Sequence, residues 1–443
     1  MGYLIMAGQL FLSLSILIVL HEMGHFFPAR WFKTRVEKFY LFFDPWFSLF
    51  KIKKGETEYG IGWLPLGGYV KISGMIDESM DREQMAGPPQ PWEFRSKPAW
   101  QRLIIMLGGV TVNFILGFFL YGMVLWTWGE SFLPSQNAKY GIAVSKLGAE
   151  LGLKDGDNVL AINGKKLKEF GDNLVRREIV INNAKNLEIE RNGEKISLPI
   201  DPKFVKILSS YDSKDEGLYG LRAPFVIGVI GKKSPAEKAK LQLKDQIIAV
   251  NGKSTPYYHQ VTKIVVQLKE KPIKLTILRN KKDTLIFPLT TTKEGKIGVG
   301  NSYEDFDFDT KKYTLGQALP AGVKAGVRFL GDQMKAYGQM FRGNIDFKES
   351  VGGFGSIATM FGDIWSWERF WRMTAVLSLV LAFMNLLPIP ALDGGHVMFL
   401  LYEIVSGRKP SDKFMEYATI LGFIIVIGLV LFANGLDIFR LFK

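Results

Sequence analysis

The sequence predicts a polytopic α-helical membrane protein with four transmembrane helices, a β-loop at the membrane edge and two small α+β extracytoplasmic domains. Three observations predict this fold class. Apolar residues make up 47% of the 443 residues, and they are concentrated in four long runs. A glycine-rich segment with strand-like alternation follows the first run, and the region between the second and third runs contains an internal repeat.

The four apolar runs are the candidate membrane spans. A bilayer core needs about 20 apolar residues as a helix, with a range of roughly 17 to 25. A buried globular helix is the alternative, but it rarely stays free of charge over such a length. The third run is short and reaches this length only with its neighbours. The runs occupy residues 4–20, 103–128, 373–387 and 417–433.

The basic residues predict the orientation in the membrane. The first run has no Lys or Arg before Arg30 and no small-x-small cleavage site, so we expect an uncleaved span rather than a signal peptide. Four basic residues follow that run, and basic residues favour the inner side. We therefore expect the N-terminus outside and residues 28–98 inside. Arg369, Arg372 and Arg440 lie on the wrong side for this rule.

The segment 39–73 alternates strand-like stretches with turns. Its glycines, which include Gly60 and Gly67, suit tight turns and close backbone approach. The segment is unusually apolar for a loop, so we expect it to enter the membrane edge, where irregular backbone is tolerated only under a cover of protein or in a watery cavity. An ordinary soluble hairpin is the alternative. The proline-rich stretch 78–98 predicts a linker.

The central region contains an internal repeat. The sequence L-K-D-G-D-N-V-L-A-I-N-G at 153–164 recurs without a gap as L-Q-L-K-D-Q-I-I-A-V-N-G at 241–252. Asn-Gly after an alternating apolar strand is a strong turn signal. The pattern resembles PDZ domains, although Lys244 stands where the first copy has Gly156. Such domains bind peptides at a sheet edge, often with the C-terminal carboxylate in a backbone nest. Peptide capture and simple exclusion of bulk both remain open.

An amphipathic helix is predicted at 320–341, after the repeats. Apolar residues there recur at spacings of four and three, which places them on one helical face. The helix either lies on the membrane surface or packs against the outer domains. Its apolar residues are Val323, Val327, Leu330, Met334, Tyr337 and Phe341.

The net charge of +13 does not indicate nucleic-acid binding. No nucleic-acid-binding module accompanies it, and the basic residues flank spans or are scattered over the central region. Anionic headgroups of the lipid bilayer are the simpler partner. The absence of cysteine excludes disulfides and cysteine-ligated metal.

The first run ends in H-E-M-G-H, residues 21–25. His21 and His25 are spaced i, i+4 and share a helix face, so both imidazoles can bind one zinc ion. Glu22 can act as general base in this H-E-x-x-H arrangement. An ionisable residue in a membrane span indicates function, because its desolvation must be compensated. The structural alternative is that Glu22 only pairs with a histidine.

A catalytic zinc needs a third protein ligand and an open position for water. Asp393, in N-L-L-P-I-P-A-L-D-G-G-H at 385–396, is the best candidate. Pro388 and Pro390 break the helix beside it. His396 is a rival ligand, and a helix cap is the alternative role for Asp393.

Together, H-E-M-G-H, the stretch G-I-G-W-L-P-L-G-G-Y-V-K-I-S-G-M, the tandem PDZ-like repeats and the N-L-L-P-I-P-A-L-D-G-G-H motif resemble the site-2 protease family of intramembrane zinc metalloproteases. The resemblance covers essentially the whole chain. It implies Zn²⁺ bound by His21, His25 and Asp393, Glu22 as catalytic base, and Asn385 in contact with the substrate backbone. The resemblance also implies substrate-binding residues: Gly60, Ile61, Gly62, Gly67, Gly68, Pro388 and Pro390.

The resemblance further implies a multi-pass protein of the bacterial inner membrane, with the PDZ-like domains and the N-terminus in the periplasm. The implied substrates are single-pass transmembrane proteins, namely an anti-sigma factor already trimmed by a first protease, and remnant signal peptides. The PDZ-like pair would then act as a size filter.

The expected segments follow from these features, in chain order. They are helix 1 with the histidines at 1–28, the inner loop with its β-hairpin at 29–98, helix 2 at 99–128, the PDZ-like domains at 129–220 and 221–306, the amphipathic helix and connector at 307–367, helix 3 with the proline motif at 368–405, and the inner loop with helix 4 at 406–443.

Two functions of other classes compete with the protease. One is a non-catalytic PDZ membrane scaffold that holds zinc only for structure. The other is a metal transporter that uses the intramembrane His and Asp residues as a pathway. Neither rival needs Glu22 as a base.

Overall fold

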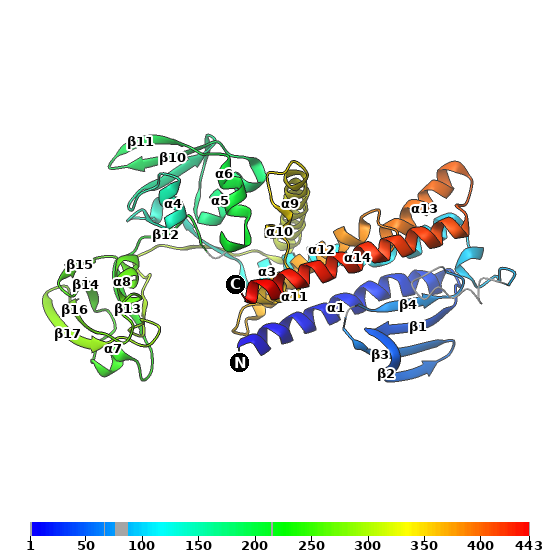
Figure 1. Cartoon of the computed structure of the whole chain (residues 1–443), viewed down its shortest axis with the longest axis horizontal. Coiled ribbons are helices and arrows are strands. Elements are labelled where there is room, and N and C mark those ends of the chain that lie inside the picture. Colours follow the sequence, from blue (N-terminus) through cyan, green and yellow to red (C-terminus); the bar gives the residue numbers. More distant parts are fainter. Residues whose placement is uncertain (1, 66, 76–86, 214–215, 443) are drawn as a thin grey trace. The chain divides into compact units, whose positions relative to one another are not determined.

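The computed structural model describes residues 2–65, 67–75, 87–213 and 216–442. The chain forms two compact units. We call Met1–Gly129, Lys312–Met334 and Val351–Lys443 the helical unit, and Glu130–Lys311 with Lys335–Ser350 the repeat unit. Each unit is described by itself below (Figure 1).

Four helices of the described chain are long and apolar enough to cross a membrane. They contain the four predicted apolar runs, except that Leu387, the last residue of the third run, lies one residue beyond α12. Apolar runs favour helices in lipid because a helix satisfies its own backbone hydrogen bonds. The chain is therefore a membrane protein with four candidate spans and separate β-rich regions. The helices are α1 (Gly2–Trp31), α3 (Ala99–Trp128), α12 (Trp367–Leu386) and α14 (Asp412–Leu441).

Glycines on α3 allow its neighbours to approach closely. A Cβ atom on Gly108 would overlap the backbone of Gly24 in α1. On another part of α3, a Cβ atom on Gly117 would lie 2.6 Å from a methyl carbon of Leu379 in α12. Small residues at such crossings are typical of helix packing in membranes. α3 thus lies between α1 and α12 and brings their polar residues together.

The proline motif separates two helices. α12 ends at Leu386, and α13 (Asp393–Ser406) begins with Asp393. Pro388 and Pro390 lie in the connection, since proline cannot continue a helix interior. The expected third span at 368–405 therefore contains two helices in the structure.

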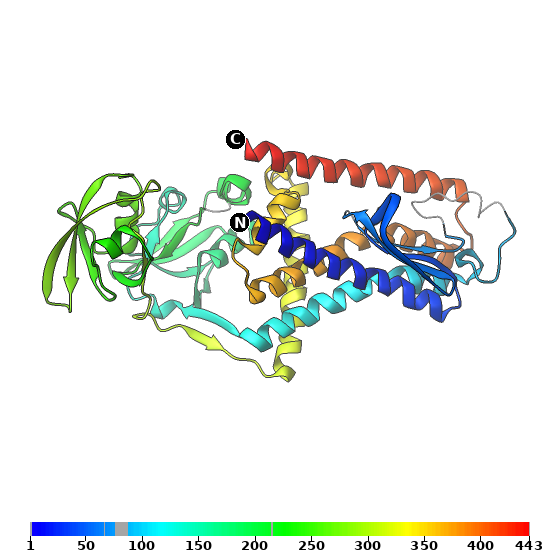
Figure 2. The ribbon, with the colours of Figure 1, turned by 90° about the horizontal axis from the view of Figure 1, so that it is seen from below.

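The membrane-edge segment forms a four-stranded sheet in the order β2-β3-β1-β4. The expected hairpin is its β2–β3 pair, and β1 runs parallel to β3. The sheet lies beside α1 in both views (Figures 1 and 2). Its strands are β1 (Val36–Leu41), β2 (Phe43–Lys54), β3 (Thr57–Leu64) and β4 (Tyr69–Ile72).

The sheet follows α1 over most of the depth of a bilayer core. Near one end of α1, Arg30 Nη1 lies 3.7 Å from Glu56 Oε2. Farther along the helix, the rings of Phe11 and Phe42 lie 5.3 Å apart. At 1.5 Å per residue these two contacts are about 28 Å apart along the helix axis. The sheet region therefore contacts α1 along most of the length of that helix.

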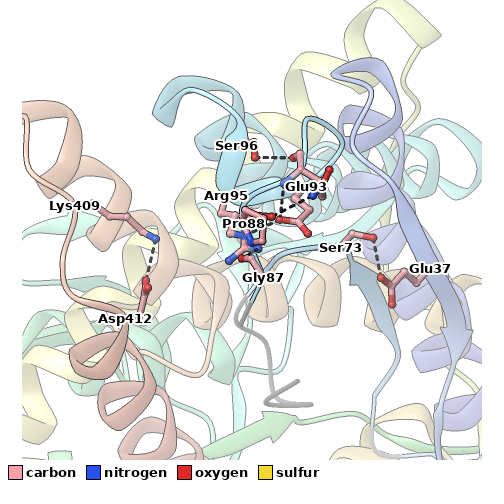
Figure 3. Close-up of polar contacts among 10 residues, drawn as sticks. Glu37, Ser73, Gly87, Pro88, Glu93, Arg95, Ser96, Lys409 and Asp412 are labelled. Atoms are coloured by element: carbon pink, nitrogen blue, oxygen red, sulfur yellow. Dashed lines mark hydrogen bonds and ion pairs between the residues drawn. The ribbon is translucent and has the colours of Figure 1, made fainter. Parts of the chain in front are cut away.

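The linker predicted at 78–98 is described from residue 87 onward. It contains the short helix η1 (Phe94–Ser96) and is tied to the sheet, since Arg35 N donates to Trp92 O at 2.9 Å. Figure 3 shows polar contacts of this region, including Arg95 Nε to Glu93 Oε2 at 2.6 Å and Ser73 Oγ to Glu37 Oε1 at 2.8 Å. The Arg35 bond thus holds the end of the linker beside the start of β1.

The repeat unit contains two similar halves. In the first half, β11-β10-β7-β8 form one sheet and β12 pairs with β6. In the second half, β17-β16-β14-β13-β18 form one sheet, with β15 paired to β14. The first half comprises β6 (Ile142–Val144), α4 (Lys146–Glu150), β7 (Asn158–Ile162), β8 (Lys165–Lys166), α5 (Asp172–Asn182), β10 (Asn186–Arg191), β11 (Glu194–Pro199), α6 (Lys203–Ser209) and β12 (Tyr219–Leu221). The second half comprises β13 (Phe225–Ile230), α7 (Pro235–Lys238), β14 (Gln246–Val250), β15 (Lys253–Ser254), α8 (Tyr258–Val265), β16 (Pro272–Arg279), β17 (Asp283–Thr290) and β18 (Val299–Asn301).

The same buried ion pair occurs in both halves. The Asp157 carboxylate accepts two hydrogen bonds of 2.8 Å from Arg191. The Asp245 carboxylate accepts bonds of 2.8 and 2.7 Å from Arg279. Both aspartates are 1% exposed, and each directly precedes the strand of its repeat motif, β7 or β14. The repeat seen in the sequence is therefore a repeat in the structure. Another sheet of this unit joins β5 (Glu130–Pro134), β9 (Glu169–Phe170) and β19 (Asp309–Lys311).

The predicted amphipathic helix forms α9 (Leu315–Phe341), and α10 (Phe347–Ser350) and α11 (Phe354–Phe361) follow it. The part of α9 in the helical unit packs on α3 through small residues, since a Cβ atom on Gly322 would overlap Gly122. Its apolar residues Val323 and Val327 remain 45% and 56% exposed. The packing face is thus the small-residue face, not the apolar face.

Candidate metal centre

Helix geometry brings two histidines to one point in α1. His21 and His25 are one turn apart, so they share a face. They are 9% and 7% exposed, and Glu22 between them is 8% exposed. Asp393, the first residue of α13, meets them because the proline-containing connection ends α12 close by.

The three candidate ligand atoms form a nearly regular triangle. His21 Nε2 and His25 Nε2 are 3.2 Å apart. Asp393 Oδ2 lies 3.3 Å from His21 Nε2 and 3.5 Å from His25 Nε2. Tetrahedral zinc with bonds of 2.0–2.2 Å places its ligand atoms about 3.4 Å apart. The spacing of these residues therefore fits a single zinc ion.

The Asp393 side chain supplies a second test of this fit. Its Oδ2 atom is buried and accepts no hydrogen bond from the described residues. A buried acceptor without a partner costs about 1–3 kcal/mol, and more when charged. A cation bound to Oδ2 would remove that cost. Two imidazole nitrogens and a carboxylate oxygen are also a donor set that zinc prefers, with a fourth position left for water.

α3 provides groups behind both histidines. The Ile105 carbonyl oxygen lies 2.9 Å from His25 Nδ1 and can accept a hydrogen bond from it. A hydrogen on Nδ1 keeps the lone pair of Nε2 free to bind a metal. Asn113 Nδ2 lies 3.2 Å from His21 Nδ1. Asn113 is not among the site residues predicted from the sequence, because a lone polar residue in an apolar run has no spacing partner. Its signal is the Gly108–Gly109 pair one helical turn earlier.

Gly109 lies against both imidazoles. A Cβ atom there would lie 2.6 Å from His21 Cε1 and would overlap His25 Nε2. Only a residue without a side chain allows α3 to pass the histidines at this distance. The glycine is therefore part of the site, although it donates no ligand.

The other residues of the proline motif lie around this cluster. Asn385, in the last turn of α12, has its Nδ2 atom 3.4 Å from His21 Nε2. Pro388 and Pro390 form the connection to α13, and a Cβ atom on Gly395 would overlap Pro390. His396 is outside the group of His21, His25 and Asp393 that can hold a metal among the described residues. Its ring instead contacts that of Phe399 at 6.4 Å.

The membrane-edge residues occupy two different places in the sheet. Gly60, Ile61 and Gly62 lie in β3, which has β2 on one side and β1 on the other. Gly67 and Gly68 precede β4, an edge strand. A Cβ atom on Gly68 would lie 3.3 Å from Glu22 Cγ. The edge that reaches Glu22 is therefore that of β4.

Two tyrosines hold the start of β4. Tyr69 donates to Asp44 Oδ1 at 2.7 Å, and Tyr40 donates to Glu58 Oε1 at 2.7 Å. Their rings stack with centroids 5.3 Å apart. These hydrogen bonds and the ring stack hold Tyr69, the first residue of β4, against its partner Tyr40 in β1.

The chain is similar to known proteins over nearly its whole length. The profile of peptidase family M50 matches residues 9–429. The regulator of sigma E protease of Haemophilus influenzae is 26% identical, with 100% of each chain covered. A predicted zinc metalloprotease of Treponema pallidum is 26% identical over 97% of this chain and 98% of its own. Metalloprotease MmpA of Caulobacter vibrioides is 25% identical over 100% of this chain and 98% of its own.

Proposed function

The chain belongs to peptidase family M50, the site-2 protease family, and from this membership we propose that it cleaves peptide bonds within the spans of single-pass transmembrane proteins. It is a membrane zinc metalloprotease. Membership of a peptidase family favours an enzyme over the scaffold and the metal transporter. The position of the metal centre inside α1 favours a substrate bond that also lies in the membrane.

We propose His21, His25 and Asp393 as the zinc ligands. The observation that carries this assignment is the position of Asp393 Oδ2, which accepts no hydrogen bond from the described residues and lies 3.3 and 3.5 Å from the two imidazole nitrogens. His396 is not proposed as a ligand, because it lies outside this group.

Glu22 is the proposed catalytic base. Zinc, when bound, lowers the pKa of a bound water toward about 7 and polarises a carbonyl group. Glu22 then accepts the proton of the attacking water and returns it to the leaving nitrogen. Asn385, next to His21, is placed to donate to the substrate carbonyl; removal of such donors costs about 2.7–4 kcal/mol elsewhere.

The β4 edge is the proposed docking strand for substrate. A transmembrane helix must unwind before hydrolysis, and its freed backbone groups need partners in lipid. Addition to a sheet edge provides them. Gly67 and Gly68 allow the edge to start beside Glu22. Gly60, Ile61 and Gly62 lie in β3, which is not an edge strand, so we assign them a structural role rather than contact with substrate. Gly60, for example, leaves room for the Tyr40 ring.

The two repeats are proposed as PDZ-like domains that form a size filter. In the first repeat, the backbone amide of Leu218, just before β12, donates to Asp172 Oδ1 at 2.9 Å. The amide is thus bound by a carboxylate of the same repeat. A PDZ domain receives the C-terminal carboxylate of a peptide on backbone amides of this kind. Because Asp172 already occupies the amide, this observation favours exclusion of bulk over capture of peptide ends in the first repeat.

The proposed setting is the bacterial inner membrane, with the N-terminus and the repeats in the periplasm. The basic residues after α1 support this orientation. The name of the Haemophilus relative supports a regulatory substrate, which we propose to be an anti-sigma factor after a first cleavage, with remnant signal peptides as a second class.

Glu22→Gln tests the proposed function. Purified full-length protein with this substitution should bind zinc as the wild type does and cut a model single-pass substrate roughly 10²–10⁴-fold more slowly. Glu194→Gln, an exposed glutamate of the repeat unit, is the matched control and should leave cleavage unchanged. Undiminished cleavage by Glu22→Gln would show that the protease assignment is wrong.

A further inference from the structure

We propose that Asn113 is a positioning residue for the metal centre, whose side-chain carbonyl accepts the Nδ1–H of His21 and so points His21 Nε2 at the zinc. This inference rests on the proposed function, because it assumes that His21 is a ligand. Asn113 does not touch the substrate or the reacting atoms.

The contact lies deep inside the helical unit. Asn113 is 1% exposed, and its Nδ2 atom is 3.2 Å from His21 Nδ1. Its Oδ1 atom is buried and accepts no hydrogen bond from the described chain. On the other side of the same imidazole, His21 Nε2 is 3.3 Å from Asp393 Oδ2. The two ring nitrogens of His21 thus face different partners.

The chemistry of imidazole decides which end of the amide faces His21. A neutral imidazole carries one N–H and one lone pair, and a ligand nitrogen must present the lone pair. With Nε2 toward the metal, Nδ1 carries the hydrogen and needs an acceptor. An amide NH₂ group cannot accept it. A half-turn of the Asn113 carboxamide exchanges Nδ2 and Oδ1 in nearly the same space. That turn gives the Nδ1–H an acceptor and gives the orphaned Oδ1 a donor.

His25 has an acceptor of the same kind beside its Nδ1 atom, but this acceptor is a backbone carbonyl. Its Nδ1 atom lies 2.9 Å from the Ile105 carbonyl oxygen, also on α3. Asn113 and Ile105 therefore flank the glycine pair at which α3 crosses α1, and each serves one ligand. Ser378 of α12 donates to the Asn113 backbone carbonyl at 2.7 Å, which fixes α3 at this residue. Of the two acceptors only Asn113 is a side chain, so it can be replaced.

Zinc affinity, measured by chelator competition on the detergent-solubilised full chain, tests the inference. Loss of such a partner typically costs 10–100-fold in metal affinity. We expect Asn113→Ala to bind zinc roughly 10–100-fold more weakly than wild type. Asn113→Asp restores an acceptor and should return affinity close to the wild-type value. Thr111→Ala, an exposed substitution on the same helix, should not change the affinity.

The outcomes separate the inference from the function on which it rests. If wild-type protein binds no zinc, the proposed function fails before Asn113 is tested. Wild-type affinity in Asn113→Ala would overturn the inference alone. Equal losses in Asn113→Ala and Asn113→Asp would also overturn it, since they would indicate packing rather than an acceptor. Absorption bands of the Co²⁺-substituted proteins provide a second readout and should shift only in Asn113→Ala.

Discussion

Gly109 of α3 lies against both imidazoles of the candidate metal centre, where there is no room for a side chain. It allows α3 to cross α1 beside both imidazoles, and a single methyl group there would overlap His25 Nε2. We expect Gly109→Ala to weaken zinc binding at least as much as loss of a supporting partner, roughly 10–100-fold. Alanine is the better helix former by about 1 kcal/mol, so a loss cannot come from helix propensity.

Gly428→Ala is the matched control for this prediction. Gly428 lies in α14 with open space around its Cβ position. Elemental analysis of the two variants should show zinc lost from Gly109→Ala and retained in Gly428→Ala. Full zinc occupancy in both would contradict the steric account of the α1–α3 crossing.

At the residue scale, the sequence predicts which residues form the His21, His25 and Asp393 cluster better than it predicts their surroundings. The i, i+4 spacing places His21 and His25 on one face whatever the rest of the chain does. Asp393 could be proposed because a carboxylate beside two prolines stands out at the end of an apolar run. Asn113 could not be proposed, because its role depends on where α3 crosses α1, and no local spacing encodes that crossing.

At the element scale, Asp172 is the basis for our proposal that the first repeat excludes bulk rather than capturing peptide ends. Its carboxylate lies at the N-terminus of α5 and accepts the Leu218 amide. Removal of a charged hydrogen-bond partner exposes that amide, and such bonds contribute about 1.5–3 kcal/mol. We expect Asp172→Ala to gain roughly tenfold or more in affinity for peptides with a free C-terminal carboxylate.

Fluorescence anisotropy with a labelled peptide checks this gain. The same peptide with an amidated C-terminus should not bind better, and Asp201→Ala, which removes an exposed aspartate of the same repeat, should behave as wild type. An equal gain for free and amidated peptides would contradict the role given to Asp172.

The repeats and the sheet also show which features of the fold the sequence patterns predict and which they do not. Asn-Gly turns after alternating strands made the two repeats visible, and the same Asp–Arg pair stabilises both. The strand-like alternation of 39–73 was also visible. The parallel pairing of β1 with β3 was not, because alternation gives the faces of a strand but not its neighbours. For this reason the edge strand beside Glu22 could not be identified before the fold was known.

At the scale of the whole molecule, the division into two units allows a deletion experiment that tests whether the repeats act as a size filter. The repeat unit has its own cores and leaves the metal centre entirely in the helical unit. We expect a chain in which a flexible linker replaces residues 130–311 to cut an untrimmed substrate that the intact chain refuses. Gel analysis of both chains with trimmed and untrimmed substrate measures this.

The trimmed substrate is the control, because both chains should cut it. Continued refusal of the untrimmed substrate by an otherwise active deletion would mean that the repeats do not select by size. Loss of cleavage of the trimmed substrate as well would instead show that the repeats take part in the reaction.

The position of the cut bond tests the central claim most directly, since the account places the base, the ligands and the docking strand at membrane depth. Mass spectrometry of the products from a purified single-pass substrate should locate one cut inside its apolar span, with a product yield roughly 10²–10⁴-fold lower from Glu22→Gln. A cut confined to the parts of the substrate outside the membrane, or an undiminished yield from Glu22→Gln, would contradict the account.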